Sequence, residues 1–358
     1  MDSFNNYIID SKQLVTNVVN IKNVLNTKTM LCAVVKADAY GLGLERVCSI
    51  IAPYVDYFAV ACVKEAKALR MFNKQTPVVI LSIIPKDCYN WCVDNNVSVT
   101  VSSEEDLIYI ENNIDKKIKV HIPINTGLNR IGISKTKQLK KMLDIIESGS
   151  HIELEGIFSH FATKQNDVVF IKKQFYNYCN VKRVIKNNVM CHIANSFATI
   201  YNKLYQLDMV RCGYLIYGNM SANGIYNKPV LKIVSAIASL TNVKKGESVG
   251  YDRTYIAKDD MLVAVIPIGY ADGLDRRLSN KGYFYIKGKK CPIVGNVCMD
   301  AAMVDVTNIE AKIGDNVLIL GCDGANNISL DDYARILGTS PYEVQIKFRY
   351  DRMNYIVV

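Results

Sequence analysis

A recurring rhythm of short apolar runs constrains the fold of this chain more than any other feature. Each run ends in polar or small residues and precedes a stretch in which apolar residues recur with a helical period. Strands that are buried on both faces produce continuous apolar runs of this kind. Eight such runs lie in the first two thirds of the chain, at residues 31–35, 57–63, 77–82, 97–101, 118–124, 154–159, 190–194 and 209–214.

The stretches between the runs predict helices at residues 44–51, 64–72, 103–112, 137–148 and 168–187. Ser103 is the expected N-cap of the third predicted helix. Eight strand–helix units with apolar strands are what a closed (β/α)8 TIM barrel requires. An open, doubly wound parallel sheet is the alternative that this pattern leaves open.

The pattern changes after about residue 228, where helical stretches become rare and turns rich in Gly, Asp, Asn and Lys separate short strands. The predicted strands are residues 231–240, 261–268, 282–286, 291–294, 302–306 and 316–320. We therefore expect two domains, a barrel over residues 1–228 and a mainly β domain over residues 229–358. Residues 1–10 can pair with the β domain instead of the barrel.

Composition excludes several classes of protein. Half of the residues are hydrophobic and 22% are charged, which is not the composition of a disordered or collagen-like chain. No apolar run approaches the roughly 18 residues that a membrane helix needs. The opening MDSFNNYIID has an acid at position 2 and no apolar segment before a cleavage site. We expect no secretory signal and a cytosolic protein.

The cysteines and histidines do not predict a metal centre. Eleven cysteines form no C-x-x-C pair, and several lie in apolar runs, among them Cys32, Cys62 and Cys191. This pattern indicates buried reduced thiols rather than disulfides or a zinc site. The chain has four histidines and no H-E-x-x-H motif, so we expect no dedicated metal site.

A net charge of +9 raises the question of a nucleic-acid partner. The densest basic groups, at residues 116–119 and 287–290, border predicted strands and have no interleaved aromatic residues. Solvated turns explain them better than a binding surface does. We expect no nucleic-acid partner.

Chemically versatile residues follow the predicted barrel strands. Lys36 ends the first strand, and a lysine confined at a barrel mouth is a candidate amine nucleophile, although an isolated lysine there is more often solvated. Other strand ends carry Arg130, His160, Asn195, Ser196, Arg211, Gly213 and Tyr214. The Ser196 hydroxyl and the backbone N–H groups near Gly213 can hold a phosphate. A phosphate site opposite an amine is typical of pyridoxal phosphate.

Ordered motifs give the chain a resemblance to a known family. From residue 33 to residue 300 they are AVVKADAYGLG, NTGLNRIG, LEGIFSHFAT, HIANSFAT, MVRCGYLIYG, VGYDRTY, IPIGYADG and CPIVGNVCMD. In this order they resemble the alanine racemases, which are fold-type III pyridoxal-phosphate enzymes. Weaker similarity extends to Tyr350.

The resemblance implies two bases on opposite faces of the substrate. Lys36 would bind the cofactor covalently and act as one base, and Tyr251 of the partner subunit would act as the other. Racemisation needs both, since the α-proton leaves one face and returns on the other. The active sites would therefore be shared across a homodimer.

The resemblance also implies how cofactor and substrate are held. Arg211, supported by His160, would face the pyridine nitrogen and leave it unprotonated, because a guanidinium is not a proton source at neutral pH. The implied cofactor-binding residues also include Tyr40, Asn195, Ser196, Gly213, Tyr214 and Tyr350. The implied substrate-binding residues are Arg130, Tyr270, Met299 and Asp300.

Several positions depart from the family pattern. Pro123 stands where a lysine, often carbamylated, is common, and Asn125 where Asp is usual, so Arg130 lacks two anionic neighbours. Asp252, Asn296 and Ala301 replace the usual Gly, Arg and Gln, respectively. Arg349 and Asp351 flank Tyr350. If Asp351 pairs with Arg349 or Arg352, alanine or serine remains the expected substrate. If it faces the pocket, a cationic substrate is favoured.

The expected function is that of a homodimeric amino-acid racemase whose substrate is alanine. Racemases for serine or for a larger or basic amino acid are the nearest alternatives. A decarboxylase or aldolase on the same barrel would not be expected to keep the GYDRTY and CMD motifs. A pyridoxal-phosphate carrier should lack the β domain.

Overall fold

The computed structural model describes residues 3–163, 167–185, 188–220, 222 and 224–358. The described residues form two compact units. One contains Leu14–Ala39 and Gly43–Lys228, and the other contains Tyr40–Leu42, Pro229–Val358 and the described residues of Met1–Gln13. The first unit carries the parallel strands and the second is mainly antiparallel.

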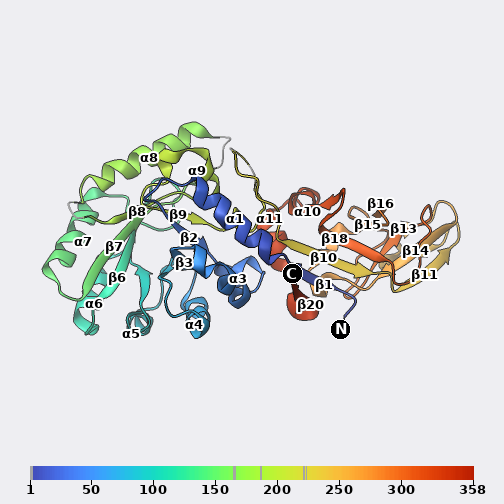
Figure 1. The fold of residues 1–358 in the computed structure, drawn as a ribbon, viewed down its shortest axis with the longest axis horizontal. Helices are drawn as coiled ribbons and strands as arrows, with labels where there is room; N and C mark the ends of the chain where they lie inside the picture. Colours follow the sequence, from blue (N-terminus) through green and yellow to red (C-terminus); the bar gives the residue numbers. More distant parts are fainter. Residues whose placement is uncertain (1–2, 164–166, 186–187, 221, 223) are drawn as a thin grey trace. The chain divides into compact units, whose positions relative to one another are not determined.

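The first unit is a nearly closed barrel of eight parallel strands (Figure 1). Strand order follows the chain, and the last strand returns to pair with the first. The N–H of Arg211, in the last strand, also donates at 3.0 Å to the carbonyl of Ala194, which lies just after the strand that precedes it in the chain. The predicted barrel is confirmed, and the doubly wound alternative is wrong because the strand order contains no reversal. The strands are β2 (Met30–Val34), β3 (Tyr57–Val60), β4 (Val78–Ile80), β5 (Val97–Thr100), β6 (Ile118–Pro123), β7 (Ile152–Phe158), β8 (Met190–His192) and β9 (Met209–Cys212).

Helices α6, α7 and α8 lie outside the barrel strands (Figure 1). Ser103 caps α6 as predicted, accepting the N–H of Asp106 at 3.1 Å. Helix α8 ends five residues before the predicted end at residue 187, and residues 186–187 lie outside the described part. Helices α1, α5 and α9 were not predicted. The helices are α1 (Ser11–Val24), α3 (Leu44–Ile51), α4 (Val63–Phe72), α5 (Tyr89–Asp94), α6 (Glu104–Asn113), α7 (Thr136–Ser148), α8 (Val168–Lys182) and α9 (Ser196–Tyr201).

The second unit is mainly β, as predicted. A seven-stranded sheet contains β1 (Asn6–Ile9), β10 (Leu231–Ala236), β15 (Tyr283–Ile286), β16 (Lys289–Pro292), β18 (Asn316–Asp323), β19 (Asn326–Ile328) and β20 (Asn354–Val357). A second sheet contains β11 (Ser239–Val243), β14 (Met261–Ile266) and β17 (Ala302–Asp305), and β12 (Ser248–Val249) pairs with β13 (Tyr255–Ile256). Two helices, α10 (Leu330–Leu337) and α11 (Pro341–Lys347), were not predicted.

The sequence prediction of one strand over residues 231–240 is wrong. Two strands, β10 and β11, lie there in different sheets. The N–H of Ile237 donates to Asp315 and that of Ala238 to Val265, so the chain passes from one sheet to the other at this point. The opening strand β1 pairs with β10 and with β20, both within the second unit. Residues 1–2 lie outside the described part.

All eleven cysteines are free. Cys32 and Cys191 are buried, but Cys62 is exposed, so the prediction of a buried thiol is wrong there. Strand β3 ends at Val60, and Cys62 is the N-cap residue of α4. Within the described residues, no helix is both long and apolar enough to span a bilayer.

Candidate active site

Lys36 follows the first barrel strand and begins a left-handed turn, α2 (Lys36–Tyr40). Residues 37–40 have φ between 51° and 59°, a conformation that costs about 1–2 kcal/mol per residue. Glu65 opposes this strain by accepting the N–H groups of Ala37 and Ala61, each at 2.7 Å. Asp38 accepts the N–H of Leu44 at 2.7 Å. The turn is therefore held by side chains, as strained backbone at functional sites commonly is.

The Lys36 amine lies in surroundings that disfavour its charge. Burial lowers the pKa of Lys36, Arg130 and Arg211 lower it further, and Glu65 acts in the opposite direction. A lysine with a lowered pKa presents more of the neutral amine, which is the nucleophilic form.

Arg211, on β9, is 4% exposed. One guanidinium nitrogen lies 2.6 Å from Nδ1 of His192. The other donates to the carbonyl of Ser159 at 2.6 Å and lies 3.3 Å from Nδ1 of His160. Burial lowers the pKa of Arg211 to about 10, and burial together with Arg211 lowers the pKa of His160 to about 3. At neutral pH Arg211 is thus a fixed cation beside neutral imidazoles.

Ser196, which begins α9 after β8, bonds backbone groups that follow β9. The hydroxyl oxygen of Ser196 accepts the N–H groups of Gly213 and Leu215, both at 3.2 Å. A hydroxyl that accepts two bonds keeps its own proton to donate. Asn195 caps α9 by accepting the N–H of Ala198 at 3.0 Å, and Tyr214 is buried. Sequence reasoning found Ser196 and Gly213 but not the bond that joins them, nor Leu215.

Arg130 is exposed in the segment after β6. Asn125 organises that segment, accepting the N–H groups of Gly127 and Asn129 at 3.1 Å and donating to Ser134 at 3.1 Å. No carboxylate in the described part of the chain pairs with Arg130. Pro123 and Asn125, which stand where the resemblance leads one to expect Lys and Asp, supply no carboxylate or carbamate to Arg130.

In the second unit, three predicted site tyrosines each begin a 3-10 turn: Tyr251–Arg253, Tyr270–Asp272 and Tyr350–Arg352. The N–H groups of Tyr270 and Ala271 donate to the carbonyls of Cys298 and Met299, both at 3.0 Å. This pairing brings the IPIGYADG and CMD motifs together. Tyr251, Tyr270 and Met299 are 69%, 43% and 54% exposed.

The remaining residues predicted in this unit have local partners. Arg352 bonds Asp272 at 2.9 Å and Asp300 at 3.1 Å. The ring of Tyr350 lies 5.1 Å from that of Tyr355, and the ring of Tyr40 lies 5.8 Å from that of Tyr342. Asp351 pairs with Arg349 through two bonds of 2.9 and 2.6 Å, the first of the two alternatives that the sequence left open.

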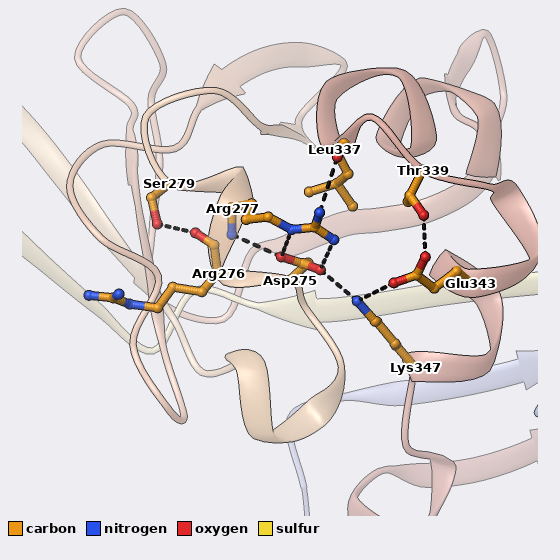
Figure 2. Close-up of polar contacts among 8 residues, drawn as sticks. All are labelled: Asp275, Arg276, Arg277, Ser279, Leu337, Thr339, Glu343 and Lys347. Carbon is orange, nitrogen blue, oxygen red and sulfur yellow. Dashed lines mark hydrogen bonds and ion pairs between the residues drawn. The ribbon is translucent and has the colours of Figure 1, made fainter.

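The segment from Tyr270 to Leu278, called the Tyr270 loop, is anchored to α10 and α11 by the polar network in Figure 2. Asp275 accepts from Arg277 at 2.8 Å and from Lys347 at 2.9 Å. Arg277 also donates to the carbonyl of Leu337 at 3.2 Å, and Lys347 pairs with Glu343 at 2.9 Å. The bonds from Arg277 and Lys347 hold the pKa of Asp275 well below its usual range, although burial opposes them.

The fold and these residues define a class of protein: a barrel enzyme with a lysine amine after its first strand and a buried arginine on its last, joined to a mainly β unit. The model of the alanine racemase N-terminal domain matches residues 9–221, and that of the C-terminal domain matches residues 230–355. The chain belongs to the alanine racemase family.

Individual relatives agree with this assignment. The chain is 37% identical to alanine racemase 2 of Caldanaerobacter subterraneus over 94% of its own length and 90% of the relative's. It is 34% identical to the alanine racemase of Clostridium kluyveri over the same shares. Among solved structures, the Bacillus anthracis alanine racemase with bound L-Ala-P has a TM-score of 0.93 and 30% identity, covering 100% of this chain and 96% of that one. The Bartonella henselae alanine racemase with covalently bound pyridoxal phosphate has a TM-score of 0.90 and 26% identity, covering 99% of each chain.

Proposed function

We propose that this chain is a pyridoxal-phosphate-dependent racemase that interconverts L- and D-alanine. The observation that carries the proposal is the Lys36 amine, held after the first barrel strand by a strained turn and with a lowered pKa, in a chain of this family. We also propose a cytosolic homodimer. Eleven free cysteines favour a reducing compartment.

The residues of the barrel unit fit pyridoxal phosphate. Lys36 would bind its aldehyde carbon, Arg211 beside His160 would face its ring nitrogen, and the Ser196 hydroxyl has a proton to donate to its phosphate. When bound, the cofactor withdraws electrons from the substrate's α-carbon and so acidifies the α-proton. Asn195, Gly213 and Tyr214 of the same unit are further residues that we propose for the phosphate. Tyr40 and Tyr350, which belong to the second unit, are proposed for it on the family resemblance alone.

Two bases of the protein would move the α-proton. The amine of Lys36 would act on one face, and the phenol of Tyr251 of the partner subunit on the other. Arg211 would leave the ring nitrogen unprotonated, because its guanidinium stays charged at neutral pH. Arg130, Tyr270, Met299 and Asp300 would receive and enclose the substrate.

The pairing of Asp351 supports alanine as the proposed substrate, because only an unpaired Asp351 carboxylate facing the pocket would favour a cationic side chain. Asp351 is engaged by Arg349 through two bonds, so its charge is compensated. An exposed pair of this kind contributes little to binding energy, typically less than about 1 kcal/mol.

The test is incubation of the purified protein with L-alanine, L-serine, L-lysine and L-arginine in deuterium oxide, with both enantiomers and released carbon dioxide measured. We expect deuterated D- and L-alanine and no carbon dioxide, with Lys36→Ala inactive. Asp351→Asn should change the lysine-to-alanine ratio of kcat/KM less than about tenfold. Released carbon dioxide would indicate a decarboxylase, and a selective larger loss for lysine would indicate a racemase for basic amino acids.

A further inference from the structure

Three buried side chains and the largely buried carboxylate of Glu155 form one hydrogen-bonded chain in the barrel unit. Arg211 contacts Nδ1 of His192 at 2.6 Å, Nε2 of His192 contacts Nδ1 of His121 at 2.8 Å, and Nε2 of His121 contacts Glu155 at 2.9 Å. The residues come from β9, β8, β6 and β7. Both histidines are fully buried. The relay, as we call Glu155, His121, His192 and Arg211, thus joins the site to a carboxylate on the far side of two imidazoles.

The relay has only one possible direction. Arg211 can only donate, so Nδ1 of His192 must accept and its Nε2 must carry the proton. Nδ1 of His121 then accepts, and its Nε2–H donates to the carboxylate of Glu155. Burial, together with the charge of Arg211, holds the pKa of His192 well below its usual range, which agrees with a neutral ring. The two charges of the relay therefore lie at its ends.

Glu155 is built to stay ionised. Tyr57 and Lys119 each donate to one of its oxygens at 3.0 Å, and Ser98 and His121 donate to the other. Burial raises the pKa of Glu155, but the hydrogen bonds from His121, Ser98 and Lys119 outweigh it and hold the pKa well below the usual range.

The backbone places these groups through a β-bulge. In the pairing of β6 with β7, Val120 lies opposite Leu154 and His121 lies opposite Gly156, so Glu155 is the extra residue. Bulges re-aim side chains and are uncommon between parallel strands. A Cβ on Gly156 would overlap the His121 ring, so only glycine leaves room for the imidazole.

We propose that Glu155 is the counter-ion of Arg211 and that the relay holds the guanidinium in one orientation and one charge state. Among the described residues, no carboxylate bonds Arg211 directly. A buried cation without compensation is costly. The Glu155 carboxylate, separated from Arg211 by the rings of His121 and His192, offsets part of that cost. Because the carboxylate does not contact the guanidinium, Arg211 still presents a positive charge to the ligand that we propose it faces. Only one part of this inference rests on the proposed function, namely that Arg211 faces the ring nitrogen of the cofactor.

The direction of the relay can be read by NMR. We expect His121 and His192, in the full chain as purified and labelled with 15N-histidine, to be Nε2–H tautomers from pH 6 to 9. The chain has four histidines, so single substitutions assign the signals. An Nδ1–H tautomer on either ring contradicts the relay.

Coupling between the two ends is tested by a double-mutant cycle in thermal unfolding. Glu155→Gln should lower the midpoint, and the matched Glu153→Gln, an exposed carboxylate on the same strand, should not. In an Arg211→Met background the drop caused by Glu155→Gln should shrink by at least half. Equal drops in both backgrounds would show that Glu155 stabilises only its local contacts with Tyr57, Lys119, Ser98 and His121, and not Arg211. If Arg211→Met does not fold, the tautomers and the cofactor spectrum decide.

The third readout is the bound cofactor. Glu155→Gln should shift its visible absorption band and lower kcat roughly tenfold with KM nearly unchanged, and Glu153→Gln should do neither. An unshifted band with wild-type kcat in Glu155→Gln, while alanine is still racemised, would overturn the relay and leave the proposed function standing. If the histidines show the expected tautomers and the two ends are coupled, but the protein racemises no alanine, the relay stands and the proposed function is overturned.

Discussion

At the scale of single residues, two departures from the family pattern explain each other. Asp252 has a left-handed backbone, φ 62°, where the usual glycine would be unstrained. Asn296 donates to the Asp252 carboxylate at 3.0 Å and, from the same nitrogen, to the carbonyl of Tyr251 at 3.1 Å. The amide thus ties both residues of the turn that presents the phenol of Tyr251. An arginine at position 296 would supply a charge, whereas asparagine supplies a short tether.

We predict that Asn296→Ala reduces kcat about three- to tenfold, because the Tyr251 turn loses its tether and the phenol its fixed position. Stability should change by less than about 1 kcal/mol, since the bonds are exposed. Asp252→Gly should partly restore kcat in the Asn296→Ala background, because glycine removes the strain. The control is Arg276→Gln, which loses a contact with Asp252 but none with Tyr251. The measurement is steady-state kinetics on five proteins: wild type, Asn296→Ala, Asp252→Gly, the double variant and Arg276→Gln. Strictly additive effects of Asn296→Ala and Asp252→Gly would contradict the tether.

At the scale of elements, the Asp275 network in Figure 2 fixes the loop that carries Tyr270. The folded-state pKa of Asp275 lies below its unfolded value, so its ionisation stabilises the fold above about pH 3.9 and this contribution is lost as pH falls. We predict that Asp275→Asn lowers stability by roughly 2 kcal/mol at pH 7, or about 4 °C in Tm. The Tm difference from wild type should shrink below about pH 4. Glu343→Gln, at the exposed end of the network, should cost less. A Tm difference that is constant with pH would show that charge plays no part.

The elements also show what the sequence can and cannot predict. Strands β2 to β9 were predictable because burial on both faces leaves an apolar run. Helix α1 was missed although Leu14, Val18 and Ile21 recur at helical spacing, because the preceding residues suggest a strand. His121 and His192 lie within predicted strands as polar exceptions, which was the available signal. Their partnership depends on a bulge and on which strands are neighbours, and neither is encoded in local periodicity.

At the scale of the whole molecule, the second unit exposes side chains that a catalytic role would require to be covered. Tyr251 is 69% exposed and Met299 is 54% exposed, in motifs that the family shares. A base open to water would lose the low-dielectric surroundings that strengthen electrostatic effects. A second copy of the chain is the partner that we propose for this surface.

We predict that Lys36→Ala and Tyr251→Phe are each nearly inactive but restore activity when their subunits exchange. In a mixed dimer, one site would contain Lys36 from one subunit and Tyr251 from the other, and the second site would lack both. Random exchange of equal amounts makes half of the dimers mixed, so about a quarter of wild-type activity should return. Native mass spectrometry of size-tagged subunits measures the exchange, and alanine racemisation is followed in the same samples. The control mixes Lys36→Ala with the Lys36→Ala/Tyr251→Phe double variant, which exchanges but rebuilds no site. Mixed dimers that form and stay inactive would show that the two bases do not meet across subunits.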